Sequence, residues 1–239
     1  MKKVYLFIIA IIALNDLALA QIDPEQMLGA WNVSSPELND QGIDAVIILA
    51  PGYFSRTHYS LEGKKFILTY GGAWEIKGNI FEQSIEYDTK DPDNVGGKDS
   101  YSFEMKDNQI QVVSSNEIWK RMDDGQPGKL AGAWLITGRE REGKMTKRTP
   151  GPRKTMKILS GTRFQWIAYN VDTKQFMGTG GGTYTTIDGK YTENIDFFSR
   201  DSTRVGASLV FDYVVIDGNW HHKGKSSKGK PIYEIWSLR

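Results

Sequence analysis

The chain contains two copies of one sequence pattern, and this repeat constrains its fold more than any other feature. LGAWNV at 28–33 returns as LAGAWLI at 130–136, and ILAPGYFSRTHY at 48–59 returns as ILSGTRFQWIAY at 158–169. Three further pairs of blocks keep the same order: 70–87 with 180–197, 100–105 with 208–213, and 116–121 with 233–239. The repeat predicts two units of similar fold, joined at the Gly- and Pro-containing segment 122–129.

Each unit has the pattern of short strands separated by turns. In the second unit the predicted strands are 130–138, 154–160, 163–170, 174–187, 190–198, 207–216, 219–223 and 231–237. Asp188-Gly189 and Asp217-Gly218 are typical two-residue hairpin turns, and no stretch shows helical periodicity. Consecutive antiparallel strands of this number can close on themselves, which removes exposed edges. We therefore predict an all-β protein made of two tandem eight-stranded antiparallel up-and-down barrels.

A glycine-rich stretch, MGTGGGTYTTI at 177–187, invites comparison with a phosphate-binding loop. Such a loop must lead into the N-terminus of a helix, whereas TYTTI has the composition of a strand. The first unit keeps Gly71-Gly72 at the corresponding place. These glycines are therefore predicted to permit a sharp bend within a long barrel strand.

The Gly-x-Trp pattern of the first strand, at 29–31 and 132–134, with an Arg after the last strand, resembles the lipocalin and calycin family. More closely, the second unit resembles bacterial secreted lipocalin-like domains, and the likeness covers both repeats. It implies that Trp31 pairs with Arg121, and Trp134 with Arg239, as a cation over an indole face that closes the barrel. The second unit departs from the pattern, because one more residue precedes its Arg.

Alternation along the strands predicts which side chains face the barrel interior. Tyr191, Glu193, Ile195 and Phe197 share one face, and the first unit aligns Phe81, Gln83, Ile85 and Tyr87 with them. An aromatic interior with a few polar groups is typical of a small-molecule pocket. The predicted ligand-binding residues are Trp166, Tyr184, Tyr191, Glu193, Tyr213, Trp220 and His222. A buried Glu193 needs a partner, such as a Tyr, His222 or an Arg, or else a raised pKa.

Three functions remain open from the residues. The favoured one is binding of a small, partly apolar molecule in the second barrel. An alternative is a barrel enzyme of isomerase or hydrolase type, with Glu193 and His222 as acid and base. The third is an interaction module whose barrels are filled by their own side chains.

The loops at the barrel mouth, the end opposite the two-residue hairpin turns, differ in charge between the two units. In the second unit, 139–153 and 223–230 are basic, whereas 34–44 and 88–99 in the first unit are acidic. This contrast favours an anionic ligand for the second barrel. No cofactor or metal is predicted, because the chain has no Cys, and because His221 and His222 are neighbours in a strand and point to opposite faces.

Residues 1–20 have the pattern of a secretory signal peptide: Lys2-Lys3, an apolar stretch at 4–14, and Ala18-Leu19-Ala20. The predicted organisation is then a signal peptide at 1–20, a first barrel at 21–124 and a second at 125–239. The short basic start suggests bacterial export to the periplasm or medium. Without residues 1–20 the chain keeps 28 basic and 28 acidic residues of its 30 and 29, which argues against nucleic-acid binding. With no Cys to accept a lipid, no membrane anchoring is expected after cleavage.

Overall fold

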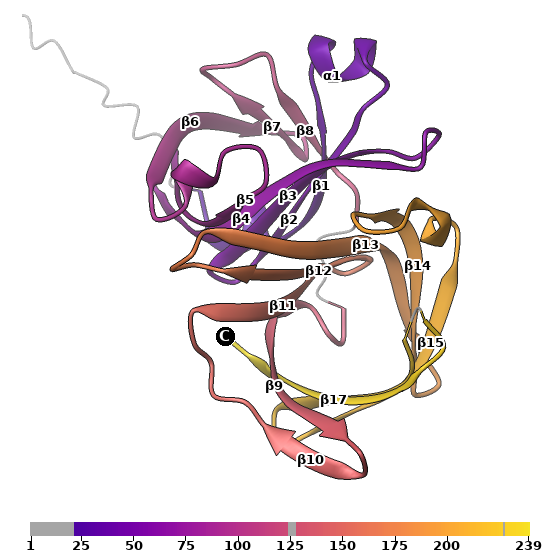
Figure 1. Ribbon diagram of the computed structural model, residues 1–239. Coiled ribbons are helices and arrows are strands. Elements are labelled where there is room, and N and C mark those ends of the chain that lie inside the picture. Colours follow the sequence, from indigo (N-terminus) through magenta and orange to yellow (C-terminus); the bar gives the residue numbers. More distant parts are fainter. Residues whose placement is uncertain (1–21, 124–127, 227) are drawn as a thin grey trace, which may run out of the picture.

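The first repeat forms a closed barrel in the computed structural model, which describes residues 22–123, 128–226 and 228–239 (Figure 1). Its strands are β1 (Gly29–Ser34), β2 (Asp44–Ala50), β3 (Tyr53–Ser60), β4 (Lys65–Lys77), β5 (Ile80–Asp88), β6 (Lys98–Lys106), β7 (Gln109–Val112) and β8 (Ile118–Arg121). Each strand pairs antiparallel with the next, and β8 pairs with β1. Short helices lie before and between them: η1 (Pro24–Met27), α1 (Pro36–Asp40) and η2 (Pro92–Asn94).

The second repeat forms a second closed barrel with one additional strand. Its strands are β9 (Gly132–Arg141), β10 (Lys144–Lys147), β11 (Arg153–Leu159), β12 (Arg163–Asn170), β13 (Gln175–Ile187), β14 (Lys190–Phe198), β15 (Ser208–Ile216), β16 (Asn219–Lys225) and β17 (Pro231–Leu238). The helix η3 (Ser202–Arg204) follows β14, and pairing of β17 with β9 closes the barrel. The predicted all-β fold of two eight-stranded antiparallel barrels is confirmed.

One predicted loop is a hairpin instead. Residues 139–153 were expected to form a long loop, but β9 continues to Arg141 and turns back as β10 at Lys144. The turn is made by Glu142 and Gly143, both of which have positive φ. The hairpin therefore carries basic side chains beyond the rim of the second barrel.

The glycine pairs in β4 and β13 lie at breaks in strand pairing. A Cβ on Gly182 would come within 1.9 Å of the backbone oxygen of Asn194, and one on Gly72 would come equally close to that of Ser84. The register with the next strand shifts at these glycines, between Gly181 and Gly182 in the second barrel. Glycine is required because the neighbouring backbone occupies the space of a side chain.

The register shift changes which residues face the barrel interior. Strict alternation predicted that Tyr87 and Phe197 point inward, and this was wrong. Both instead belong to a buried cluster between the two barrels, because the bulge interrupts the two-residue period of β5 and β14. Up to Ile85 and Ile195 the predicted inward face is correct.

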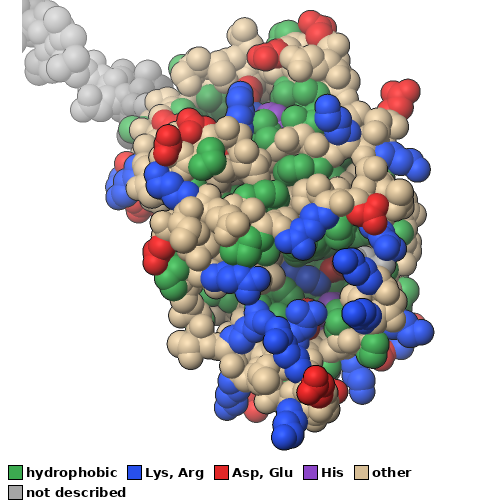
Figure 2. Space-filling model, in the orientation of Figure 1, with side chains coloured by type: hydrophobic (Ala, Val, Ile, Leu, Met, Phe, Trp, Pro, Cys, Tyr) green, Lys and Arg blue, Asp and Glu red, His purple; other side chains and the backbone are tan. Residues whose placement is uncertain are grey.

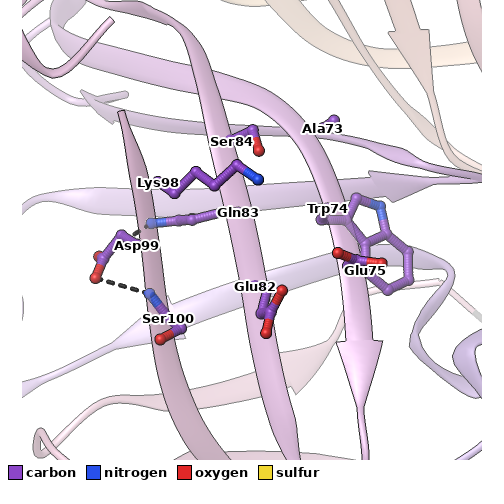
Figure 3. Close-up of a pocket in the computed structure, with 9 residues that line it drawn as sticks. All are labelled: Ala73, Trp74, Glu75, Glu82, Gln83, Ser84, Lys98, Asp99 and Ser100. Atoms are coloured by element: carbon purple, nitrogen blue, oxygen red, sulfur yellow. Dashed lines mark hydrogen bonds between the residues drawn. The ribbon is translucent and has the colours of Figure 1, made fainter. Parts of the chain in front are cut away.

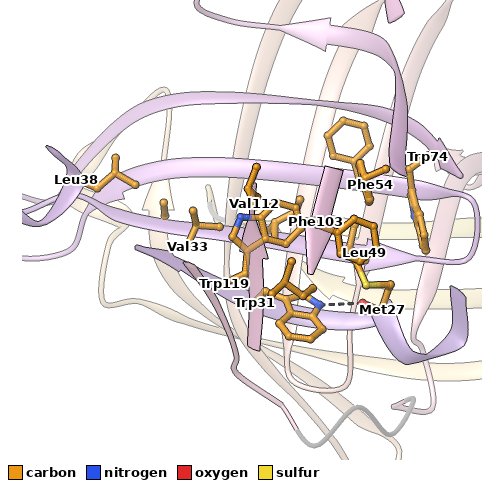
Figure 4. Close-up of a cluster of buried hydrophobic side chains, with 14 of the residues drawn as sticks. Met27, Trp31, Val33, Leu38, Leu49, Phe54, Trp74, Phe103, Val112 and Trp119 are labelled. Atoms are coloured by element: carbon orange, nitrogen blue, oxygen red, sulfur yellow. Dashed lines mark hydrogen bonds between the residues drawn. The ribbon is translucent and has the colours of Figure 1, made fainter. Parts of the chain in front are cut away.

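The interior of the first barrel is apolar and aromatic. Trp31, Phe54, Phe81 and Trp119 are almost completely buried in one cluster, and Figure 4 shows the side chains of β1, β3 and β8 meeting there. The indole Nε1 of Trp31 donates to the carbonyl oxygen of Met27 at 2.8 Å.

At the closed end of this barrel, the guanidinium of Arg121 lies 4.0 Å from the centre of the Trp31 ring. It also donates to the carbonyl oxygens of Leu28 and Gln26. The guanidinium therefore covers the indole ring and also bonds backbone carbonyl groups of the segment that leads into β1.

The closed end of the second barrel is built differently. Trp134 makes the same kind of bond as Trp31, because its indole nitrogen donates to the carbonyl of Leu130 at 2.9 Å. The residue paired with Trp134 across the strands is Leu238, whereas the residue paired with Trp31 is Arg121. The expected pairing of Trp134 with Arg239 is wrong. The extra residue moves Arg239 beyond β17, where its guanidinium lies 3.9 Å from the ring centre of Tyr53 in the first barrel.

The two barrels share a buried face. Residues that point outward from β2 and β3 pack against those of β11 and β12, and Ile48, Ile158 and Tyr169 are at most 3% exposed. Across this face Arg239 forms a two-point ion pair with Glu86, with N–O distances of 2.8 and 2.9 Å. The repeats are therefore joined by a continuous core rather than only by the connecting chain.

A polar node lies within this shared face. The side-chain amide of Gln165, which is 2% exposed, accepts from Ser55 at 2.5 Å and Thr57 at 2.8 Å, and donates to Thr69 at 2.9 Å and Thr179 at 3.0 Å. Both its oxygen and its nitrogen are thus fully bonded, as a buried amide requires.

The predicted signal peptide at 1–20 lies outside the described residues, and so do residues 124–127 of the predicted joint. In the described part of the chain, none of the helices has the length and apolar character needed to cross a membrane.

Candidate binding site in the second barrel

A buried ion pair occupies the centre of the second barrel. The ammonium of Lys157, on β11, lies 2.6 Å from the carboxylate of Glu193, on β14, and both side chains are at most 6% exposed. The ammonium is also 4.9 Å from the ring centre of Tyr191, 5.0 Å from that of Trp220 and 5.3 Å from that of Trp236. Aromatic faces stabilise a cation at this range, so the charge is held by Glu193 and by the rings together.

A second cluster of ionisable side chains lies beside this pair. His222, on β16, places Nδ1 3.5 Å from Oε2 of Glu234 on β17, which is too long for a good hydrogen bond. Arg139 approaches the same carboxylate at 3.3 Å. Burial and the neighbouring Lys157 ammonium lower the pKa of His222, which favours its neutral form. Burial alone would raise the pKa of Glu234, but contacts with His222, Lys157 and Arg139 lower it.

Several buried polar atoms here have no protein hydrogen-bond partner. Within the described residues these are the Tyr191 hydroxyl, Nε1 of Trp220 and of Trp236, and both ring nitrogens of His222. Buried polar atoms are nearly always bonded, so five exceptions in one barrel need an explanation. They are side chains from three different strands, and they surround the charged pair. A polar group that entered the barrel from outside the chain would find its hydrogen-bond partners among these atoms.

The mouth of this barrel is basic. Arg139 and Arg141 lie on β9, Arg148 directly follows β10, and Arg153 begins β11, which pairs with β9. Burial and the positive charges of the other three lower the pKa of Arg148. Of the four, only Arg139 has a carboxylate within ion-pair distance among the described residues. Figure 2 shows Lys and Arg side chains gathered around a hollow in the lower half of the molecule. An anion entering the barrel would therefore meet an attractive field.

The charged centre belongs to the second barrel alone. In the aligned register, the first barrel has Ile47, Gln83 and Val112 where the second has Lys157, Glu193 and His222. Gln83 donates to Asp99 at 3.3 Å and lines a hollow of about 470 Å³ between β4, β5 and β6 (Figure 3). The two repeats thus share a backbone but not an interior chemistry.

The sequence-predicted residues fall into two groups. The structure brings Tyr191, Glu193, Trp220 and His222 together around Lys157. Tyr184 lies instead at the closed end, where its hydroxyl donates to the carbonyl of Ser160 at 2.6 Å.

Trp166 and Tyr213 are half-buried at the edge of the same apolar cluster. His221 points to the outer face, as expected for a neighbour of His222, and contacts the Tyr233 hydroxyl at 2.8 Å. The described residues contain no group of three or more His, Asp or Glu side chains placed to hold a metal ion.

Sequence reasoning missed Lys157, Glu234 and Arg139. Glu193 was expected to find a Tyr, a His or an Arg, yet its partner is a lysine. Two signals could have found them: alternation from Leu159 places Lys157 inward, and the glutamate of Glu-Ile-Trp recurs in both copies, as Glu117 and Glu234. Glu193 pairs with Lys157 rather than with His222, which was one of its expected partners, and the carboxylate near His222 is that of Glu234, at 3.5 Å.

Comparison with known families adds one finding. Residues 129–238, which span the second barrel, match a family described as a domain of unknown function (DUF4488). The comparison with curated proteins found no match for the chain. The matched region and the two barrels fit a lipocalin-like fold.

Proposed function

We propose that the second barrel binds a small, partly apolar molecule that carries an anionic group. The observation that carries this proposal is the set of unpartnered polar atoms around Lys157 and Glu193. A ligand with hydrogen-bonding groups would satisfy Trp220, Trp236 and His222, and the aromatic rings would contact its apolar part. The four arginines on β9, after β10 and at the start of β11 favour a carboxylate or another anion at the ligand's outer end.

We further propose that the protein acts after export to the periplasm or the medium. The support for this is the sequence of residues 1–20 alone, with its basic start, apolar stretch and small residues at the end. A soluble carrier or sensor of a small anion fits such a location.

Tyr191→Phe is the sharpest test of the interior site. The first barrel has Phe81 at the aligned position, so the ring is known to fit this fold. Because the Tyr191 hydroxyl is buried without a protein partner, its removal should leave the unfolding free energy unchanged or raise it by about 1 kcal/mol. The same change should weaken retention of small molecules, measured by native mass spectrometry of protein purified from its own host. Unchanged retention in the Phe variant would count against this site.

The anionic preference can be tested with a pair of fluorescent probes. Anilinonaphthalene sulfonate carries a negative charge, whereas phenylnaphthylamine has a similar ring system without one. Arg148→Ala should weaken binding of the sulfonate, and added salt should do the same. Lys120→Ala, an exposed basic residue on β8 of the first barrel, is the matched control and should have no effect. An equal loss of sulfonate binding in Arg148→Ala and in Lys120→Ala would contradict a basic mouth that selects anions.

A further inference from the structure

The mouth of the first barrel has a second hollow, of about 470 Å³, that the second-barrel site does not involve. It lies beneath α1, and its apolar wall is formed by Leu38, Ile43, Ile67 and Leu68. A volume of this size is in the range of small-molecule sites. Of this wall, Leu38 belongs to the apolar cluster that fills the barrel, and Ile43 packs against that cluster.

The floor of this hollow holds a buried but neutralised charge. Arg56 is 8% exposed and makes a two-point ion pair with Glu117, with N–O distances of 2.6 and 2.9 Å. Its Nε donates to Nε2 of His58 at 3.0 Å. The guanidinium therefore already has partners for its charge, and Glu117 raises its pKa against the effect of burial.

His58 completes the floor as a neutral donor. Burial and the Arg56 charge lower the pKa of His58 to about 4, so the ring is uncharged at neutral pH. Since Nε2 accepts from Arg56, the proton of the neutral ring is on Nδ1. That N–H is a hydrogen-bond donor which the triad of Arg56, Glu117 and His58 does not use.

The two charged side chains that line the rim of the hollow balance each other, although the loops at 34–44 and 88–99 are acidic overall. These two are Glu37 and Lys90, with opposite signs. The floor is balanced and the wall is apolar, so a charged ligand would lose its hydration without gaining a counter-ion. This contrasts with the arginine-rich mouth of the second barrel.

The geometry points to a second binding site at the first-barrel mouth, for an uncharged, partly apolar small molecule with a hydrogen-bond acceptor that faces His58. This site is independent of the proposed second-barrel function. The aligned positions of Arg56 and His58 in the second barrel are Trp166 and Ala168, so the triad is specific to the first repeat. The two barrels would then select ligands of different charge.

Phenylnaphthylamine is the probe for this site. Its binding should be indifferent to salt and should fall at least about tenfold in Ile67→Trp, which fills the hollow from β4. Tyr191→Phe, which alters only the second barrel, should leave it unchanged. Strong salt dependence, a normal affinity in the Trp variant, or a loss in the Phe variant would each overturn the assignment.

A second measurement uses the unaltered protein and so does not depend on a variant folding. In a methyl NMR spectrum, the probe should shift the signals of Ile43, Ile67 and Leu68 before any others. Shifts confined to the second barrel would overturn the assignment.

Glu117→Gln tests the reason for the neutral preference. This change leaves the Arg56 charge without its counter-ion, so the first-barrel mouth should gain salt-dependent affinity for anilinonaphthalene sulfonate. The gain should persist in a protein that also carries Tyr191→Phe. If the folded variant gains no such affinity, the Arg56–Glu117 pair does not set the charge preference, and the assignment to uncharged ligands fails.

Discussion

Lys157 and Glu193 form an ion pair inside the second barrel, at positions that hold Ile47 and Gln83 in the first. The same backbone therefore accepts either a charged pair or a pair without charge. A buried ion pair is weak support for stability, because desolvation offsets most of the attraction. Its presence in only one repeat fits a role in recognition.

Exchanging these residues for their first-barrel counterparts gives a sharp prediction. Lys157→Ile alone or Glu193→Gln alone leaves one buried charge unpaired and should lower the unfolding free energy by roughly 3–5 kcal/mol. The double variant should lie closer to the wild type than either single variant. Urea unfolding of all three proteins measures the coupling. Additive losses would mean that the two side chains do not act as a pair.

The glycine at the β13 bulge should be intolerant of any side chain. Gly182→Ala places a Cβ within 1.9 Å of a backbone oxygen, so β13 and β14 must move apart, at a cost of about 4 kcal/mol or more. Gly189→Ala is the matched control. That glycine has a φ of +72° in a hairpin turn with no atom near its Cβ position, so only conformational strain of about 1 kcal/mol is expected. Thermal unfolding would distinguish the two, and similar losses would contradict the steric argument.

Stability should fall in acid partly through His58. Its pKa in the folded protein, about 4, is below the ordinary value of 6.5, so the unfolded state binds more protons between these limits. The contribution of neutral His58 is therefore complete above about pH 6.5 and is lost as the pH falls towards about 4.

His58→Gln keeps an acceptor for Arg56 but cannot titrate. Unfolding free energies measured at about pH 7, 5.5 and 4.5 should show a smaller decline in this variant than in the wild type. His222→Val, the first-barrel residue at that position, is a useful comparison because burial also lowers the pKa of His222. Parallel curves for wild type and His58→Gln would exclude this source of acid sensitivity.

The pair of Arg239 and Glu86 should stabilise the contact between barrels. Its side chains are 9% and 21% exposed, and Arg239→Ala should lower the unfolding free energy by about 2 kcal/mol, between the values for exposed and buried pairs. Lys77→Ala removes surface ion pairs with Glu82 and Glu75 and should change little. Denaturant unfolding compares them, and equal effects would show that burial of the Arg239 pair contributes nothing.

Much of the fold could be predicted from the sequence because its signals are local. The repeat, the Asp-Gly turns and the two-residue period each depend on a few neighbouring residues, and the strands at 163–170 and 190–198 match the structure at both ends. The predicted inward directions of Phe197 and Tyr87 were wrong because a bulge breaks the two-residue period there. The position of a bulge depends on how the adjacent strand pairs.

The candidate site was predicted less completely, since it depends on contacts between distant strands. Tyr191, Glu193, Trp220 and His222 were found by alternation, but the partner of Glu193 comes from β11, 36 residues earlier in the chain. Arg239 was assigned to Trp134 by resemblance, whereas one additional residue sends it to the other barrel. Nothing in either repeat by itself indicates that their outer faces meet.

That meeting of outer faces makes the two repeats mutually dependent. Removal of either repeat would expose to solvent the buried side chains of the other at this face, which include Ile48, Ile158 and Tyr169. The amide of Gln165 would also lose its hydrogen bonds to hydroxyl groups of the first barrel. A chain cleaved between the copies should consequently give fragments that remain associated and melt in a single step. The two copies therefore behave as one folding unit with two barrels, and neither copy is complete without the other.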